Sequence, residues 1–416
     1  MKKSFAILLA VSLLVTIVCL SVGWAAEKTT LKLYLCTTDQ KDVLDEINAG
    51  FMKKYPRIKV EMDVSGGGQF ESILKTKIAA GETPDIFSVW SGGLMAQYAA
   101  KGHLLDLTNQ PYMKRLTNLS KSTMVLKGKV YAIPWNMVPE GLFYNKKIFR
   151  DLKLSPPQNW NEFLSVCEIL KKNNIIPLAS GFKDDWVLIR FVNASFPSIV
   201  YGREPNFDQK LIAGKAKFSD KNDLEVYQKL KILVDKEYFD KSPLSTSYDQ
   251  ANNMFAQGKA GMYIQGSWAL TQLQSGGNID IGFMPLPVNN PGEALRGCWH
   301  VEIGMAASSK TKNRDAVNKY FDYFTSNAVY KNYITKKKIY SVLQDVTAPV
   351  NPVTDEFKLK YVDTNKVTTW AHEYWPNSFN MDWRKKLQEL VAGATTPEEL
   401  VKWMDAEYAK AENLYK

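Results

Sequence analysis

Three residue types that bind metal ions alternate at Cys298, His300 and Glu302. Alternate side chains of a β-strand project from one face, so these three would point one way and Trp299 and Val301 the other. Thiolate, imidazole and carboxylate are all ligand types for zinc and related ions. Three neighbouring positions of one strand converge poorly on a single ion, however. We therefore favour a polar strand edge beside a cleft and expect no metal.

Carboxylates offer a second chemistry, because glycoside hydrolysis uses a pair of Asp or Glu side chains. Asp184, Asp185 and Glu302 would be the members of such a pair, but in a chain with 43 acidic residues paired carboxylates arise by chance. The sequence has no Gly-x-Ser-x-Gly elbow and no P-loop, and its three histidines share no zinc-protease spacing. We expect a protein that is not an enzyme and needs no cofactor.

Tryptophan is the strongest functional signal, with 11 residues in the chain. Sugar rings have an apolar C–H face that stacks on aromatic planes, and their hydroxyls bind polar side chains. Several tryptophans lie at expected strand ends or in polar stretches, whereas Trp160 and Trp403 lie in helical patterns and are expected in the core. The pattern favours a sugar-binding cleft. The tryptophans in question are Trp90, Trp135, Trp186, Trp268, Trp299 and Trp375, with Asn136, Asp184, Asp185, Arg190, His300 and Glu302 nearby.

The elements that would position these side chains alternate along the chain. Residues 31–35, 58–62 and 175–179 have strand patterns, and helical spacing is found at 43–51, 70–80, 160–171, 224–236, 316–324, 381–392 and 397–412. Alternating strands and helices predict an α/β fold with largely parallel sheets. Ligands of such sheets bind beyond the carboxyl ends of the strands, which draws attention to Asp39 and Trp90.

The length of 416 residues suggests two or three domains, and the composition, with 45% hydrophobic and 23% charged residues, is that of a globular protein. No flexible linker separates the domains. We therefore expect the chain to cross between lobes more than once, near residues 134–141, 285–288 and 339–343.

The first residues predict export. Lys2 and Lys3 precede an apolar stretch, and small residues at Gly23 and Ala25 suit a signal peptidase, so we expect a signal peptide over residues 1–25. An uncleaved anchor and lipidation of Cys19 are alternatives. The mature protein is expected in the periplasm or at the outer face of the cytoplasmic membrane.

Charge and cysteine content exclude other classes. The net charge is +10, but the basic residues are scattered, so we expect no nucleic-acid partner. Cys36, Cys167 and Cys298 are an odd number of mature cysteines that cannot all pair, and we expect buried thiols rather than a disulfide framework.

Several segments together resemble one family, the extracellular solute-binding proteins of ABC sugar importers of the maltose-binding type. Gly-Glu-Thr-Pro-Asp-Ile-Phe at 81–87 is similar to a family segment, and so is the helix that follows at 98–107. Similar segments recur at 128–134, 143–146 and 255–268, whereas 159–163 has Asn where the family often has Thr and Asp. The matches keep the family order over nearly the whole mature chain.

The resemblance implies the two-lobe periplasmic-binding-protein fold, each lobe a mostly parallel sheet flanked by helices and the lobes joined by a multi-strand hinge. We expect residues 26–136 and 286–340 in lobe 1, and 137–285 and 341–416 in lobe 2. The lobes would close on a carbohydrate ligand, expected to be an oligosaccharide. A monomer would then deliver it to the permease subunits of an ABC importer.

We expect ligand contacts from residues that lie in the family segments or directly after an expected strand. They are Asp39, Trp90, Ser91, Trp135, Asn136, Trp186, Trp268, Trp299, His300, Glu302, Trp375 and Trp383.

Two other functions fit part of this pattern. A secreted glycoside hydrolase or lyase would share the aromatic cleft but would cleave oligosaccharides. A surface adhesin for polysaccharide would have a flat aromatic strip and no lobe closure.

Overall fold

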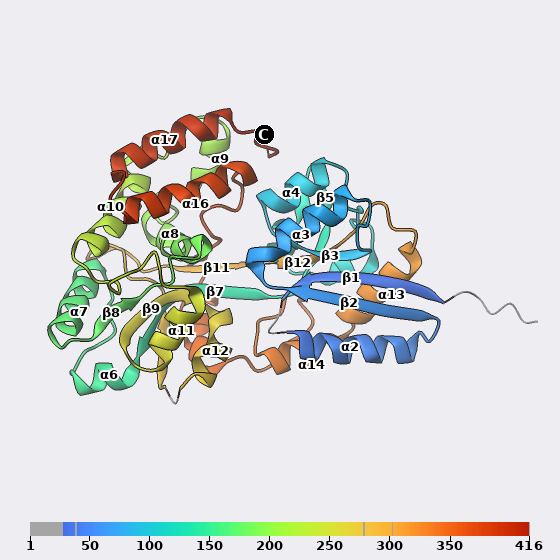
Figure 1. Ribbon diagram of the computed structural model, residues 1–416, viewed down its shortest axis with the longest axis horizontal. Coiled ribbons are helices and arrows are strands. Elements are labelled where there is room, and N and C mark those ends of the chain that lie inside the picture. The colour runs from blue at the N-terminus through green and yellow to red at the C-terminus, as the bar shows by residue number, and fades with distance from the viewer. Residues whose placement is uncertain (1–27, 38–39, 278, 302, 416) are drawn as a thin grey trace, which may run out of the picture.

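The computed structural model describes residues 28–37, 40–277, 279–301 and 303–415. The expected signal peptide and the expected contacts Asp39 and Glu302 lie outside these residues. The described chain forms two α/β lobes side by side, with strands running from one to the other (Figure 1). The expected two-lobe fold is confirmed.

Lobe 1 is built on a sheet with the strand order β2-β1-β3-β12-β6. In β1, Leu31, Leu33 and Leu35 are buried while Lys32 between them is exposed. Helices α2 and α14 cover one face of the sheet, and α3 and α4 cover the other (Figure 1). The elements are β1 (Thr29–Cys36), α2 (Lys41–Lys54), β2 (Ile58–Ser65), α3 (Gly67–Ala79), β3 (Ile86–Trp90), α4 (Gly93–Ala100), η1 (Pro111–Arg115), α5 (Asn118–Ser122), β4 (Val125–Leu126), β5 (Lys129–Val130), β6 (Ala132–Pro134), β12 (Ile303–Ala307), α13 (Arg314–Thr325) and α14 (Asn327–Lys337).

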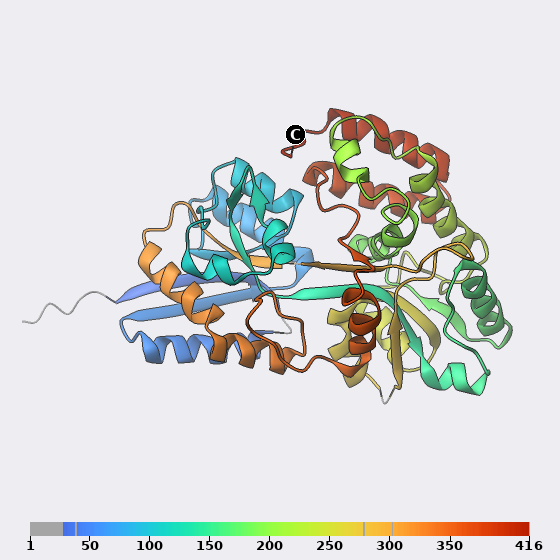
Figure 2. The same ribbon diagram turned by 180° about the vertical axis from the view of Figure 1, so that it is seen from behind.

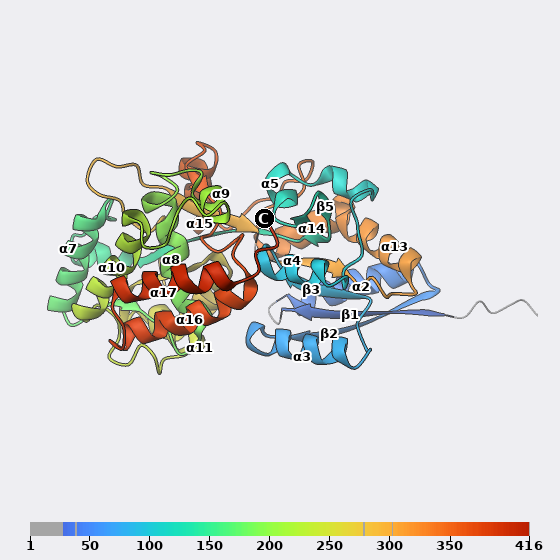
Figure 3. The ribbon, with the colours of Figure 1, turned by 90° about the horizontal axis from the view of Figure 1, so that it is seen from above.

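Lobe 2 has the strand order β13-β11-β7-β9-β8, with β10 also paired to β7. Helix α8 packs against α10 and α16, and α17 packs on both of these, as the view from above shows (Figure 3). The elements are β7 (Met137–Asn145), α6 (Lys146–Asp151), α7 (Trp160–Lys172), β8 (Ile176–Ala179), α8 (Asp185–Ile199), α9 (Phe207–Ile212), α10 (Lys221–Asp235), α11 (Tyr248–Ala256), β9 (Ala260–Gly266), η2 (Ser267–Ala269), α12 (Leu270–Ser275), β10 (Ile281–Met284), β11 (Gly297–Val301), α15 (Pro352–Phe357), η3 (Lys358–Val362), β13 (Val367–Thr368), α16 (Asn377–Val391) and α17 (Pro397–Lys410).

Both sheets combine parallel pairs, which in lobe 2 are β8 with β9 and β11 with β13, with antiparallel pairs around the crossing strands. β1 runs parallel to β2 and β3, but β12 is antiparallel to both β3 and β6. In lobe 2, β7 is antiparallel to β9, β10 and β11. The reason is topological. The strands β6 and β7 carry the chain from lobe 1 to lobe 2, and β11 and β12 carry it back. The outgoing and returning strands therefore run in opposite directions.

Two of the crossings between the lobes are the step from β6 to β7 and the step from β11 to β12. β6 belongs to the sheet of lobe 1 and β7 to that of lobe 2, and β7 pairs with β11 along the path between them (Figures 1 and 2). Since β11 lies in lobe 2 and β12 in lobe 1, the chain returns after Val301. The expected crossing at 285–288, and with it the lobe boundary at residue 286, is wrong. Pro285 and Pro287 belong to a loop that stays on lobe 2, where Asn289 donates to the carbonyl of Gln158 (3.1 Å).

The third crossing also comes later than expected. Leu343 bridges to Leu116, and the amide of Gln344 donates to the carbonyl of Arg115 (2.9 Å), so this segment still lies on lobe 1. Asn351 already contacts Gln274 of lobe 2 (3.3 Å). The chain therefore crosses between residues 345 and 351 and not at 339–343.

The described helices include the segments whose helical spacing was noted in the sequence, but α4 ends at Ala100, so the helix expected at 98–107 is wrong beyond that residue. None of the described helices is both long and apolar enough to span a lipid bilayer. The core of lobe 2 encloses Trp383, which is 0% exposed and meets the ring of Trp375 edge-on at 5.1 Å. Trp160 is buried as expected. Trp403 is only partly buried, since it covers the ring of Phe379 from outside (6.0 Å between centroids).

This difference predicts unequal losses of stability. Trp383→Ala should lower the free energy of unfolding by about 3–5 kcal/mol because it opens a cavity in a closed core. Trp403→Ala should lower it by clearly less, since part of its ring already faces water. Urea unfolding followed by circular dichroism measures both. Equal losses would contradict the packing described here.

Candidate functional site

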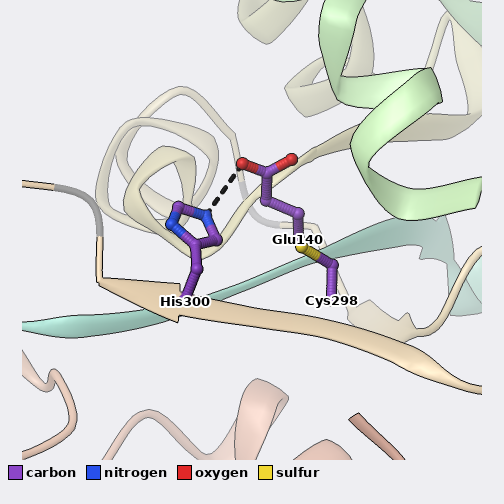
Figure 4. Close-up of side chains that lie close together, drawn as sticks. All are labelled: Glu140, Cys298 and His300. Carbon is purple, nitrogen blue, oxygen red and sulfur yellow. Dashed lines mark hydrogen bonds and ion pairs between the residues drawn. The ribbon is translucent and has the colours of Figure 1, made fainter. Parts of the chain in front are cut away.

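A cluster of polar side chains lies where the crossing strands meet lobe 2. Glu140 on β7 is 0% exposed, and its Oε1 accepts from the guanidinium of Arg190 on α8. His300 on β11 donates from Nε2 to the same oxygen at 2.9 Å, and the amide of Asn193 donates to it at 3.4 Å. Figure 4 shows Glu140 and His300 reaching toward each other from their strands. The ion pair therefore ties α8 to both crossing strands.

Cys298 joins this cluster, as the alternation in the sequence predicts. Atoms of Glu140, Cys298 and His300 that are able to bind metal lie within 4.8 Å of one another, and all three side chains are buried (Figure 4). Burial raises the pKa of Glu140, but the charge of Arg190 and the hydrogen bond from His300 outweigh it and leave that pKa below its usual value. Burial and the charge of Glu140 raise the pKa of the Cys298 thiol. With Arg190 already neutralising the carboxylate and the thiol held protonated, the cluster fits a charge-paired brace better than a metal centre.

Three tryptophans surround Arg190. Its guanidinium carbon lies 5.9 Å from the ring of Trp186, 5.5 Å from Trp268 and 6.0 Å from Trp370. A cation at such distances from aromatic rings is attracted by their negative faces. Gly266 permits this arrangement, because a Cβ at that position would collide with the indole of Trp268. Arg190 thus couples the buried ion pair to a group of aromatic rings, which we call the Arg190 box.

The segment between β13 and α16 connects the Arg190 box to lobe 1. Trp370 stacks on His300 (4.0 Å between centroids) and donates from its indole N–H to Glu373 Oε2. Ser91, at the end of β3, donates to the same oxygen (3.2 Å), and the amide of Gly93 donates to the carbonyl of Glu373 (3.1 Å). Burial raises the pKa of Glu373 to about 8. The two lobes therefore meet at this carboxyl group.

Glycine is required on the lobe 1 side of this contact. Gly92 has φ 72°, and a Cβ there would collide with the carbonyl of Glu373. The turn after β3 can therefore lie directly against the backbone of residues 373–375.

The expected tryptophan contacts divide into two groups. Trp90, Trp186 and Trp268 are partly exposed: Trp90 directly precedes Ser91 in lobe 1, and the other two lie against Arg190 in lobe 2. Trp135, Trp299, Trp375 and Trp383 are at most 5% exposed. Their ring faces are covered by core side chains, so we remove these four from the set of expected ligand contacts. Trp299, for example, packs edge-on against Tyr340 at 4.5 Å on the far side of β11 from His300.

Several buried polar atoms near the crossing strands have no hydrogen-bond partner in the described part of the molecule. They are Trp135 Nε1, Asn136 Oδ1, Glu140 Oε2, His300 Nδ1 and Glu373 Oε1. Buried polar atoms are nearly always paired with protein or water, so an unpaired group of this size marks a place where water or ligand is expected. Asn136 and His300 were both expected contacts.

A pocket of about 210 Å³ lies between lobe 1 and the end of the chain. Helix α4 forms one wall, and the start of α16 with residues 412–415 forms the other. Its polar lining residues are Gln97, Lys101, Asn377, Ser378, Glu412 and Asn413. None of the partly exposed tryptophans lines it, so it is separate from the Arg190 box.

Sequence reasoning missed Trp370, Glu140 and Glu373 as members of the site. Glu140 sits among apolar residues of β7, and a charged residue inside such a run is a signal that we did not use. Trp370 and Glu373 lie in an irregular stretch dense in aromatic residues, 370–375, where no periodicity guides a prediction.

Comparison with known proteins gives a consistent result. The family model described as "Bacterial extracellular solute-binding protein" matches residues 37–331. The multiple sugar-binding protein of Streptococcus mutans is 26% identical over 360 residues, 84% of this chain and 83% of that protein. The melibiose/raffinose/stachyose-binding protein MelE of Bacillus subtilis is 23% identical over 423 residues, 99% of this chain and 97% of that protein.

Solved structures share the fold. A chitin oligosaccharide binding protein superposes with a TM-score of 0.84 at 24% identity, covering 93% of this chain and 99% of that one. The protein RafE in complex with raffinose has a TM-score of 0.76 at 22% identity, covering 93% of this chain and 100% of that one.

The buried ion pair gives a direct prediction. Glu140→Gln should lower the free energy of unfolding by about 3–5 kcal/mol, because it leaves the charge of Arg190 buried without its partner. The matched control is Glu407→Gln, which removes an exposed pair with Lys410 (2.7 Å) and should cost less than about 1 kcal/mol. Urea unfolding compares the two variants. A loss for Glu140→Gln as small as that of the control would show that the pair does not brace the fold.

Proposed function

The chain belongs to the family of bacterial extracellular solute-binding proteins, and on this premise we propose that it binds an oligosaccharide between its lobes and delivers it to an ABC importer. Relatives that align over most of this chain are named for sugars, among them melibiose, raffinose and stachyose. Proteins of the same fold are named for chitin oligosaccharide and raffinose. Oligosaccharide is therefore the ligand class that we assign to this chain.

One observation carries the proposal: each lobe has partly exposed tryptophans connected to the contact between Ser91 and Glu373. Trp90 belongs to lobe 1, while Trp186 and Trp268 belong to lobe 2 and are positioned by Arg190. Indole faces on opposite sides of a cleft suit the apolar faces of sugar rings. We assign sugar stacking to these three residues.

Polar recognition would come from the crossing strands and the turn after β3. Asn136 Oδ1, His300 Nδ1 and Glu373 Oε1 are buried and unpartnered, and sugar hydroxyls are able to donate to or accept from such atoms. Ser91 is an expected contact that in this conformation donates to Glu373 and to the carbonyl of Val301 (2.9 Å). A sugar hydroxyl would compete for these groups.

Delivery depends on lobe motion. The crossing strands and residues 345–351 are the connections through which the lobes move, and a hinge needs only a few such positions to absorb the change. A ligand that touches both lobes favours the closed arrangement by its differential affinity for it. We propose that the permease subunits recognise this closed arrangement.

The remaining assignments follow from the same role. The protein acts as an exported monomer that binds its sugar without cleaving it. This distinguishes it from a secreted hydrolase, which would degrade the oligosaccharide, and from an adhesin, which would not close.

Replacement of Trp268 tests the sugar-binding face. A thermal-shift panel of mono- and oligosaccharides first identifies a ligand, since a ligand that binds only the native state raises its melting temperature. Trp268→Ala should then weaken binding of that sugar at least about tenfold, or about 1.4 kcal/mol, in calorimetric titration. Trp403→Ala, which changes a partly buried tryptophan that packs on Phe379 of α16, should leave affinity unchanged. Equal affinities for both variants and the parent would place the sugar elsewhere.

Lobe closure is tested by small-angle X-ray scattering. Addition of the same sugar should reduce the radius of gyration of the parent protein, because the lobes approach each other. The Trp268→Ala variant, at saturating sugar, should reach the same radius of gyration as the parent protein with sugar bound. An unchanged radius with the sugar bound would exclude the clamp and favour the adhesin.

A further inference from the structure

A second group of buried oxygen atoms lies inside lobe 2, away from the Arg190 box. The hydroxyl of Tyr201 is 2.9 Å from Asp208 Oδ2 and 3.4 Å from each of the carbonyl oxygens of Trp370 and Ala371. A tyrosine hydroxyl has one proton, so it cannot fully satisfy three acceptors. The convergence leaves an excess of electron-rich oxygens at this point.

Asp223 adds to the excess. It lies in the first turn of α10, is 0% exposed, and has no hydrogen-bond partner for either oxygen. Asp208 Oδ1 and the hydroxyl of Tyr227, one helical turn after Asp223, are also buried and unpartnered. Burial and the charges of Asp208 and Asp223 raise the pKa of Tyr201.

No positive charge compensates these carboxylates within the described ranges. Neither Asp208 nor Asp223 takes part in an ion pair there, and the acids Glu204, Asp220 and Asp405 further raise the pKa of Asp223. Burial raises the pKa of Asp208 to about 7, and burial together with the charge of Asp208 raises that of Asp223. Two buried acids without a cation are costly unless they are protonated or bind one.

Protonation alone leaves the problem unsolved. A protonated carboxyl group gains an O–H donor that itself needs an acceptor, and the described structure provides no partner for either oxygen of Asp223. A bound cation satisfies several oxygens at once and removes the charge imbalance.

We propose that Asp208, Asp223 and the carbonyl oxygens of Trp370 and Ala371 form a binding site for a divalent cation of the calcium type. The donors are all oxygens, carboxylates together with backbone carbonyls, which is the ligand set that calcium takes in flexible, high-coordination sites. Thiol and imidazole donors, which zinc prefers, are not part of the group. Extracellular calcium modules bind in the range of about 0.1–1 mM, which an exported protein encounters.

The site would have a structural consequence for the sugar cleft. Residues 370–373 supply Trp370 to the Arg190 box and Glu373 to the contact with Ser91. A cation on the carbonyls of Trp370 and Ala371 would fasten this segment to α9 and α10 of lobe 2. The proposal does not depend on the identity of the sugar.

The test uses the full mature chain after treatment with EDTA. Calcium chloride at about 1 mM should raise the melting temperature by about 3 °C or more, and magnesium by clearly less. In Asp223→Asn the calcium shift should disappear, while the melting temperature without calcium stays equal or rises, because an uncompensated buried charge is removed. Asp235→Asn, at the exposed end of the same helix, should keep the full shift.

A second measurement tests the site even if the Asp223→Asn variant does not fold. Terbium(III), a luminescent substitute for calcium, should give emission sensitised by the nearby Tyr201 and Trp370, and calcium should compete it away. Asp208→Asn should abolish that emission. No calcium shift in the parent, an undiminished shift in Asp223→Asn, or terbium emission that survives in Asp208→Asn would each overturn the proposal.

Discussion

The buried ion pair between Glu140 and Arg190 is the interaction on which the arrangement of this molecule depends. Taking both charges out of water costs free energy, and only close pairing with further hydrogen bonds offsets that cost. Here His300 and Asn193 supply those bonds, so β7, β11 and α8 are held at one point. Because the same guanidinium lies among Trp186, Trp268 and Trp370, the position of the aromatic rings follows from the position of the pair.

The two lobes contribute unequally to the candidate site. Lobe 2 contains the ion pair and the tryptophans of the Arg190 box, whereas lobe 1 contributes Trp90 at the end of β3 and Ser91 after it. The lobes meet through hydrogen bonds to Glu373 and through a glycine turn that allows backbone to lie against backbone. Such contacts are few and local, so they can be exchanged for contacts with a sugar without disturbing either core. The same segment reaches back into lobe 2 at Ala371, where the inferred cation site would hold it.

Local periodicity allowed the prediction of the α/β class and of most expected helices, whereas the two lobes were predicted from the resemblance to a known family. The sequence did not allow the exposure of individual tryptophans to be predicted. Trp90 and Trp135 both follow strands that end near the crossing, yet Trp90 is partly exposed and Trp135 is buried, and only the packing of distant segments such as the one around Tyr330 decides this. The lobe boundary was placed too early because the prolines at 285 and 287 end a strand without ending a lobe. Glu373 was missed because its partner Ser91 is 282 residues away in the chain.

A crystal structure of the protein with an oligosaccharide identified in the binding screen tests the central claim most directly. The account predicts a sugar ring against Trp90 of lobe 1 and another face of the same ligand against Trp186 or Trp268 of lobe 2, with a hydroxyl within hydrogen-bond distance of Asn136, His300 or Glu373. A sugar bound to one lobe alone, or in the pocket between α4 and residues 412–415 with the Arg190 box unoccupied, would contradict it.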